Sequence, residues 1–271
     1  MTEPDIYLLG RSAREEERLR KQVDELAGEA RWLLDQCQIQ PGARALEVGC
    51  GPQGVLELLS ERVGTSGSVV GLDSNESFVA SARAHVAERR LTNVAVEHGD
   101  ARATHLPRAS FDVVFCRLVL VNVPRPEQIV AELVSLLRPG GVLASHEADY
   151  LSHGCDPPSP AWDRLFAIFQ AYNRAKRIDM FVGRRTQRML RDAGLVDLHV
   201  NPVIHVYPHG HHRRSIFLDF IENIRGALVA EGLAKEEELN ELTQDLRRHL
   251  DDPDTLVVSH LFFQVWGRKP A

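Results

Sequence analysis

Short apolar runs, turns and amphipathic helices repeat in a regular order along residues 43–147. The apolar runs predict strands at 45–48, 68–72, 94–97, 111–116 and 142–147, and the periodic segments between them predict helices at 55–63, 77–90 and 126–137. Strands and helices at this spacing form βαβ units, and right-handed crossovers place the helices on both faces of the sheet. The pattern therefore predicts an α/β fold with a mostly parallel sheet.

The rest of the chain does not follow this rhythm. Helical periodicity covers 11–38, 162–175, 186–193 and, with an interruption near Gly232, 213–250, while 196–207 and 255–266 are strand-like. We expect residues 1–40 to form an N-terminal helical cap segment, and residues 41–271 to form the core with cap insertions at about 156–180 and 211–250. Such a cap would cover the carboxyl ends of the strands, where open α/β sheets bind ligands.

Composition narrows the classes of partner. The 271 residues include 32 Lys and Arg against 38 Asp and Glu, a formal net charge of -6, which disfavours nucleic acid because phosphates require a basic surface. The most apolar run, 113–123, is broken by Arg117 and Asn122 and is too short to span a bilayer. We therefore expect neither a nucleic-acid nor a membrane partner.

The spacing of the cysteines and the N-terminal residues bear on the cellular compartment of the protein. The four cysteines lie far apart without a C-x-x-C pair, which favours separate reduced thiols. The acidic N-terminal residues lack the apolar core of a secretion signal. Together these features predict a cytoplasmic protein.

A glycine-rich turn, Glu47-Val48-Gly49-Cys50-Gly51-Pro52-Gln53-Gly54, comes directly after the first predicted strand. Glycines allow a tight turn and a close approach of the backbone to a ligand. The acid Glu47 would repel a pyrophosphate but suits a cationic ligand, which disfavours the alternative of an NAD-dependent oxidoreductase.

Two further acids follow the next two strands. Asp73 ends the run Val69-Val70-Gly71-Leu72-Asp73, where a carboxylate can accept hydrogen bonds from both ribose hydroxyls of a nucleoside. Asp100, in His98-Gly99-Asp100-Ala101, could accept a hydrogen bond from an adenine amino group. The acids and glycines together indicate a site for a positively charged nucleoside.

The series EVGCGPQG, GLD, HGDA, FDVVFCRLVLVNVP and LRPGG, in this order over residues 43–150, resembles the class I S-adenosylmethionine (SAM)-dependent methyltransferases. The resemblance implies a Rossmann-like, mostly parallel seven-stranded sheet with helices on both faces, a helical cap and a final strand inserted antiparallel. Shorter matches at 7–10, 18–22, 183–185 and 192–195 are similar to the small-molecule and natural-product methyltransferases of this class.

The resemblance also implies a SAM site, with one role for each matching position. Glu47, Gly49 and Gly51 would hold the methionine part with Gln53 near its carboxylate, Asp73 would bind the ribose beside Ser74, Asp100 and Ala101 would bind the adenine, and Cys116 and Arg117 would line the sulfonium end.

Methyl transfer asks the protein to align a nucleophile, exclude water and, where needed, remove a proton. The segment after the fifth predicted strand offers His146 and Glu147, and His146 has the better ordinary pKa for a base. Tyr7 and His153 are weaker candidates. His209, His211 and His212 lie in a Pro/Gly turn without ligands at suitable spacing, so we expect no metal.

The sequence thus predicts a SAM-dependent methyltransferase of secondary metabolism that modifies an O, N or C atom of a small, partly apolar metabolite. Apolar cap residues such as Trp162, Phe166 and Phe169 would enclose that substrate. The alternatives are a nucleic-acid or protein methyltransferase and a non-catalytic SAM-binding protein. A homo-oligomer is also left open, because the N-terminal helix could pack on a neighbouring subunit.

Overall fold

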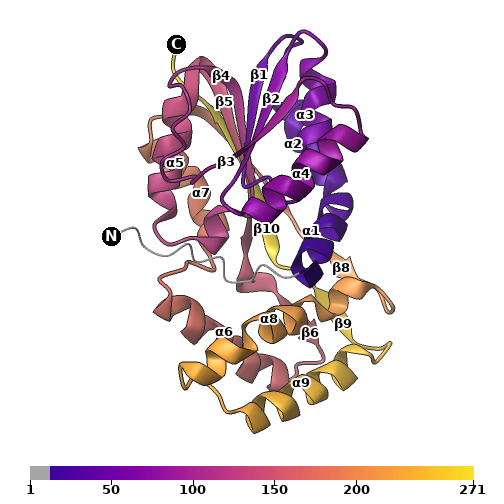
Figure 1. Ribbon diagram of the computed structural model, residues 1–271. Helices are drawn as coiled ribbons and strands as arrows, with labels where there is room; N and C mark the ends of the chain where they lie inside the picture. The colour runs from indigo at the N-terminus through magenta and orange to yellow at the C-terminus, as the bar shows by residue number, and fades with distance from the viewer. Residues whose placement is uncertain (1–12) are drawn as a thin grey trace.

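A seven-stranded sheet forms the centre of the computed structural model, which describes residues 13–271 (Figure 1). Its strands are β1 (Arg44–Val48), β2 (Ser68–Asp73), β3 (Val94–His98), β4 (Phe111–Arg117), β5 (Leu137–Asp149), β7 (Val196–Val203) and β10 (Leu261–Arg268). They lie in the order β3-β2-β1-β4-β5-β10-β7, with β1 to β5 parallel and β10 antiparallel to both its neighbours. The predicted α/β fold, including the antiparallel last strand, is confirmed.

Helices cover both faces of this sheet. On one side lie α2 (Ala27–Gln36), α3 (Leu56–Val63) and α4 (Glu76–Glu88), and on the other lie α5 (Pro126–Leu136) and α7 (Val182–Asp192), as Figure 1 shows. Side chains that alternate along a strand reach the two sides. On β4, Phe115 belongs to the same core cluster as Leu59, whereas its neighbour Val114 belongs to the cluster that contains Ile129.

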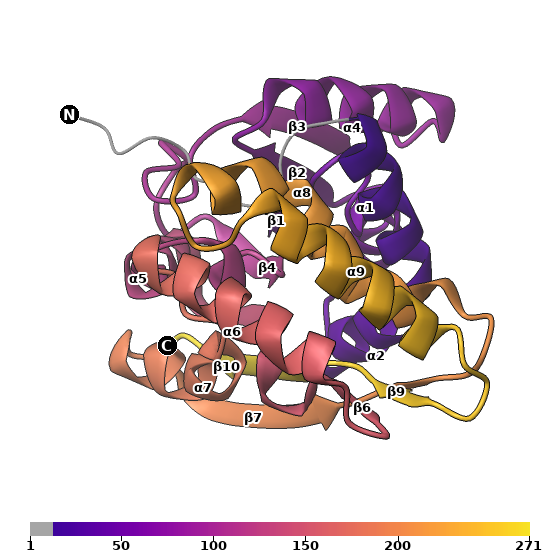
Figure 2. The ribbon, with the colours of Figure 1, turned by 90° about the horizontal axis from the view of Figure 1, so that it is seen from below.

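A cap lies across the carboxyl ends of the parallel strands (Figures 1 and 2). It consists of α6 (Pro160–Ala175), α8 (Ile216–Ala230), α9 (Glu236–Leu250) and a small sheet of β6 (Gly154–Asp156), β9 (Leu256–Val258) and β8 (Val206–Tyr207). Short 3-10 turns lie at η1 (Leu120–Asn122), η2 (Tyr150–Ser152) and η3 (His212–Ser215), and helix α1 (Ala13–Glu25) runs beside the sheet toward the cap. The cap helices lie within residues 156–180 and 211–250, and the division into an N-terminal cap segment and a core with cap insertions stays a prediction.

Three predicted elements are divided in the structure. The expected helix 11–38 is interrupted at Leu26 between α1 and α2, and the expected strands 196–207 and 255–266 each contribute one strand to the large sheet and one to the cap. The chain changes sheets where the backbone N–H of His205 donates to Ser259 Oγ at 2.9 Å. Periodicity could not locate the break at Leu26, because the apolar pattern continues across it.

None of the helices in residues 13–271 combines the length and the apolarity needed to cross a bilayer.

Candidate functional site

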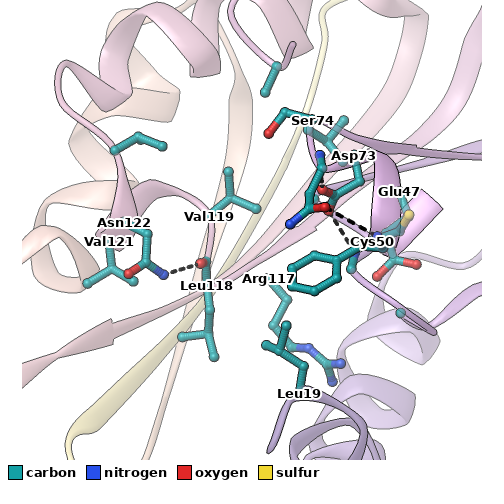
Figure 3. Close-up of a pocket in the computed structure, with 18 of the residues that line it drawn as sticks. Leu19, Glu47, Cys50, Asp73, Ser74, Arg117, Leu118, Val119, Val121 and Asn122 are labelled. Carbon is teal, nitrogen blue, oxygen red and sulfur yellow. Dashed lines mark hydrogen bonds between the residues drawn. The ribbon is translucent and has the colours of Figure 1, made fainter. Parts of the chain in front are cut away.

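A pocket opens at the carboxyl ends of the strands (Figure 3), and residues of the cap also line it. One half of its wall comes from the loops after the strands and includes Glu47, Gly49, Gly51, Asp73, Ser74, Asn75, Asp100, Ala101 and Arg117. The other half comes from α1, the end of β5, the cap and β10, and includes Arg18, Gln22, Ala148, Tyr150, Arg213, Phe220, His260 and Phe262. We call these the strand-end half and the cap half.

The glycine-rich turn after β1 is closed around the buried Glu47 carboxylate, which accepts from the backbone N–H of Val55 at 2.8 and 2.9 Å. A Cβ on Gly54 would overlap Glu47 Oε2 and lie 2.9 Å from the Cys50 carbonyl oxygen, and a Cβ on Gly49 would overlap Val119. Both glycines also have positive φ, at +61° and +69° respectively. Glycine is therefore required here by close packing as well as by backbone conformation.

The glycines at 49, 51 and 54 have the G-x-G-x-x-G spacing that dinucleotide-binding loops also show. Spacing alone therefore does not separate a nucleoside site from a dinucleotide site. The distinguishing feature at this loop is the acid Glu47 inside it.

The charge of Arg117, at the end of β4, acts on that acid. Burial raises the pKa of Glu47 to about 8, although the Arg117 guanidinium favours its ionised form. Burial also lowers the pKa of Arg117, and its Nη1 has no hydrogen-bond partner among the described residues. Figure 3 shows this side chain extending toward Leu19 of α1. A buried guanidinium with an unused donor suits a ligand that carries a carboxylate.

Asp73, at the end of β2, connects two loops of the pocket. Its Oδ2 accepts from the backbone N–H of Gly51 at 2.8 Å, and its Oδ1 accepts from that of Asn75 at 2.9 Å (Figure 3). Asn75 caps α4 through its side-chain oxygen, whereas its buried Nδ2 lines the pocket without a partner among the described residues. Carboxylate and amide groups thus converge at one part of the wall, and the ribose-binding role of Asp73 stays a prediction.

Asp100 follows β3 and is held by its own loop. Its carboxylate accepts from the Arg102 side chain at 2.7 and 3.0 Å and from the Arg102 backbone N–H at 2.8 Å. The side-chain bond to Arg102 lowers the pKa of Asp100. Ala101 and Arg102 line the pocket beside it, so an adenine here would meet an ion pair rather than a lone carboxylate.

Other predicted site residues lie outside the described wall of the pocket. Gln53 is half-buried in the turn after β1, and the Cys116 thiol is buried inside the sheet with its Sγ 3.4 Å from Ser145 Oγ. Burial raises the pKa of that thiol. Tyr7 lies outside the described residues. The roles assigned to these three residues stay predictions.

His146 and Glu147 lie within β5, three and two residues before its end respectively, and neither side chain lines the pocket. The Glu147 carboxylate accepts from the backbone N–H groups of Val119, Leu120 and Val121 at 3.1 to 3.2 Å, and burial raises its pKa to about 8. Glu147 therefore holds the turn that lines the pocket after β4.

The His146 imidazole is fully buried, and neither nitrogen has a hydrogen-bond partner among the described residues. Burial, with the nearby Arg117, lowers its pKa to about 3. The two bases predicted from sequence thus lie behind the pocket wall, and their part in proton transfer stays a prediction.

Sequence reasoning missed several residues of the pocket, notably Asn75, Arg213, Phe220 and His260. One signal was available for His260. The pair Ser259-His260 interrupts an otherwise apolar strand pattern, and such an interruption is a common sign of a strand break or a site.

The parallel sheet with its antiparallel last strand, the glycine turn and the strand-end acids define a class I SAM-dependent methyltransferase fold. Residues 46–145 match the family model for the methyltransferase domain, so the chain carries a methyltransferase domain of this SAM-dependent class.

Known relatives agree with this assignment. The nocamycin O-methyltransferase of Saccharothrix syringae is 42% identical over 112 residues, 41% of this chain and 40% of the relative. The demethylmenaquinone methyltransferase of Shouchella clausii is 34% identical over 136 residues, 50% of this chain and 55% of the relative. The chain spans about half the length of these curated relatives.

Among solved structures, the chain is similar to phosphoethanolamine N-methyltransferase 2 of Haemonchus contortus in complex with SAM. The TM-score is 0.56 at 18% identity, over 88% of this chain and 51% of that one. This likeness concerns the fold.

Proposed function

We propose that the protein transfers the methyl group of SAM to an O, N or C atom of a small, partly apolar metabolite. The main support is that three features of the strand-end half line one cavity. These are the turn fixed by Glu47, the Asp73 carboxylate and the unpaired Arg117 donor. The two relatives are named for methylating nocamycin and demethylmenaquinone, which supports a small-molecule acceptor.

The chemistry of the residues that line the strand-end half suits SAM. Gly49 and Gly51 would let the backbone approach the methionine part. We assign the Arg117 guanidinium, which the sequence predicted at the sulfonium end, to the methionine carboxylate, because its Nη1 has no partner among the described residues. Asp73 and Asn75 would bind the ribose hydroxyls, with Ser74 beside them. Bound SAM would supply a methyl group already activated on its sulfonium.

The protein's own contribution is positioning and exclusion of water. Glu147 fixes the turn at 119–121, and Arg18, Leu19 and Gln22 of α1 close the pocket from the side. A reactant held in one orientation loses little entropy on the way to the transition state. We also propose that the protein acts in the cytoplasm, since free cysteines, here at positions 37, 50, 116 and 155, are typical of reducing compartments. A role in secondary metabolism stays a proposal that rests on the resemblance to natural-product methyltransferases.

Calorimetric titration of SAM and S-adenosylhomocysteine into the full chain tests this proposal. Asp73→Ala should weaken both affinities by about tenfold or more, since hydrogen bonds to the ribose and to Gly51 are lost together.

Asp112→Ala is the matched control. Asp112 also accepts a backbone N–H, that of Arg44 at 2.7 Å, but it does not line the pocket. The control should keep its affinity for SAM. No measurable affinity in the unmodified protein, or equal losses in the two variants, would contradict the proposed function.

A further inference from the structure

The cap half of the pocket is built around one imidazole ring. Tyr150, Phe220, His260 and Phe262 all line this half. The His260 ring centroid lies 4.6 Å from that of Tyr150, 5.2 Å from that of Phe262 and 6.2 Å from that of Phe220. Rings in such arrangements favour a planar, apolar ligand that can stack or pack edge to face.

Buried nitrogen atoms lie among these rings. His260 is 5% exposed, and its Nδ1 has no hydrogen-bond partner among the described residues. His153 packs behind it at 4.5 Å between ring centroids, also without a partner for either nitrogen in the described part of the chain. Unpaired buried polar groups are uncommon in folded proteins and call for an explanation such as a ligand.

Burial keeps both imidazoles neutral. It lowers the pKa of His153 to about 3 and that of His260 well below its ordinary value. The charged or titratable groups that act on His260 are His153, Arg213, Arg18 and His205. All of them disfavour an imidazolium, so His260 is neutral and a ring nitrogen can accept a hydrogen bond.

The charges in the cap half distinguish between acceptors. Its guanidinium groups, Arg18 and Arg213, are each paired with a glutamate, Glu15 at 2.7 Å and Glu25 respectively. Among the described residues, the acids that line the pocket, Glu47, Asp73 and Asp100, all belong to the strand-end half. An ammonium group in the cap half would therefore find no carboxylate partner among the described residues of that half.

We propose that the cap half binds an aromatic or conjugated acceptor that carries a hydroxyl group, and that His260 accepts the hydrogen bond from this hydroxyl and takes its proton during methyl transfer. This rests on the proposed function and narrows it to O-methylation. Because a buried imidazole is a weak base, the acidic hydroxyls of phenols and enols suit it best.

The transfer step balances within this arrangement. The acceptor oxygen forms a bond to the methyl carbon with its lone pair, while the electrons of the carbon–sulfur bond return to sulfur and leave S-adenosylhomocysteine. The hydroxyl proton passes to a His260 nitrogen and then to water, which restores the neutral imidazole. His153, which lies behind His260, is a positioning residue for this ring.

The test measures how tightly probe compounds bind to the full chain after it has been saturated with S-adenosylhomocysteine. Three probes share one ring system: 2-naphthol, 2-methoxynaphthalene without a donor, and cationic 2-naphthylmethylamine. We expect 2-naphthol to bind about tenfold tighter than the methoxy compound, the effect of one hydrogen bond, and the cation to bind weakest.

Substitutions of His260 test whether this residue causes the preference for 2-naphthol. His260→Leu should abolish the preference for 2-naphthol, and His260→Asn, which keeps a hydrogen-bond acceptor, should restore part of it. Affinity for S-adenosylhomocysteine should persist in both. His209→Leu, at an exposed histidine outside the pocket, is the control and should keep the full preference.

The two proposals fail differently. If S-adenosylhomocysteine binds but 2-naphthol binds no tighter than 2-methoxynaphthalene, or if the preference survives His260→Leu, the acceptor proposal is overturned and the proposed function stands. If S-adenosylhomocysteine does not bind the unmodified chain, both are overturned. Because the comparison of probes needs only the unmodified chain, it remains decisive even if the leucine variant fails to fold.

Discussion

The two halves of the pocket are built in different ways. In the strand-end half, the ligand-facing groups lie at or just after strand ends, and backbone contacts fix two of them: Val55 N–H fixes Glu47 and Gly51 N–H fixes Asp73. In the cap half, Arg18, Tyr150 and His260 come from distant parts of the chain and meet through packed rings and ion pairs.

The difference separates two tasks. The strand-end half offers an acid–glycine cradle that backbone geometry defines, and this suits a ligand shared by many enzymes. The cap half offers rings and neutral imidazoles whose identity depends on side chains alone. Changes in the first half should therefore affect cofactor affinity and folding together, whereas changes in the second should affect acceptor binding.

The largest effect on stability is expected from a substitution that disrupts the glycine-rich turn of the strand-end half. Gly54→Ala should lower the free energy of unfolding by about 3 kcal/mol, because the residue has a positive φ and its Cβ would overlap the Glu47 carboxylate. It should also weaken SAM binding. Denaturant unfolding and calorimetry measure the two effects.

Gly232→Ala is the matched control for that experiment. Gly232 has a similar φ of +69°, but a Cβ there would have nothing within 4 Å. The control should cost only about 1 kcal/mol and leave SAM affinity intact. Equal losses in the two variants would show that the contact with Glu47 has no role.

A smaller effect is expected on the pH dependence of stability, and it concerns His146, which lies inside the core rather than in the pocket wall as His260 does. The pKa of His146 is lowered to about 3, so its neutral form contributes stability that is fully present above its unfolded pKa near 6.5 and is lost as the pH falls toward 3. Between pH 7 and pH 5 this group should account for about 2 kcal/mol of lost stability.

Unfolding titrations at several pH values check this prediction. His146→Leu should reduce the loss of stability between pH 7 and pH 5 by that amount, because leucine cannot bind a proton. An unchanged pH dependence would mean that the imidazole is not buried as described.

Most of the strand-end half could be predicted from the sequence, because its ligand-facing residues lie at strand ends or directly after them along the chain. The turn after β1, Asp73 and Ala101 occupy the pocket as expected, since strand ends in a parallel sheet meet at one edge. The pairing of Asp100 with Arg102 could not be foreseen from spacing alone.

Strand register explains the departures from the predicted site. Neighbouring side chains on a strand point to opposite faces, so Arg117 reaches the pocket while Cys116 is buried. The fifth strand was predicted to end at residue 147 but continues to Asp149, which keeps His146 and Glu147 inside the sheet. Tyr150, just beyond that end, lines the pocket instead.

The cap half was predicted only as an apolar enclosure. Its aromatic residues were recognisable by type, but periodicity does not say which of them face a cavity and which face each other. Trp162, expected to enclose the substrate, packs against Phe217 at 4.9 Å between ring centroids and lies outside the described wall of the pocket. Which aromatic residues face the cavity is decided by tertiary contacts between α1, α8 and β10.

A crystal structure of the protein with S-adenosylhomocysteine tests the two-half account most directly. We predict that its carboxylate contacts the Arg117 guanidinium, its ribose contacts Asp73, and its sulfur faces the space bounded by Tyr150 and His260. A ligand bound with its sulfur turned away from these two rings, or bound outside this pocket, would contradict the account.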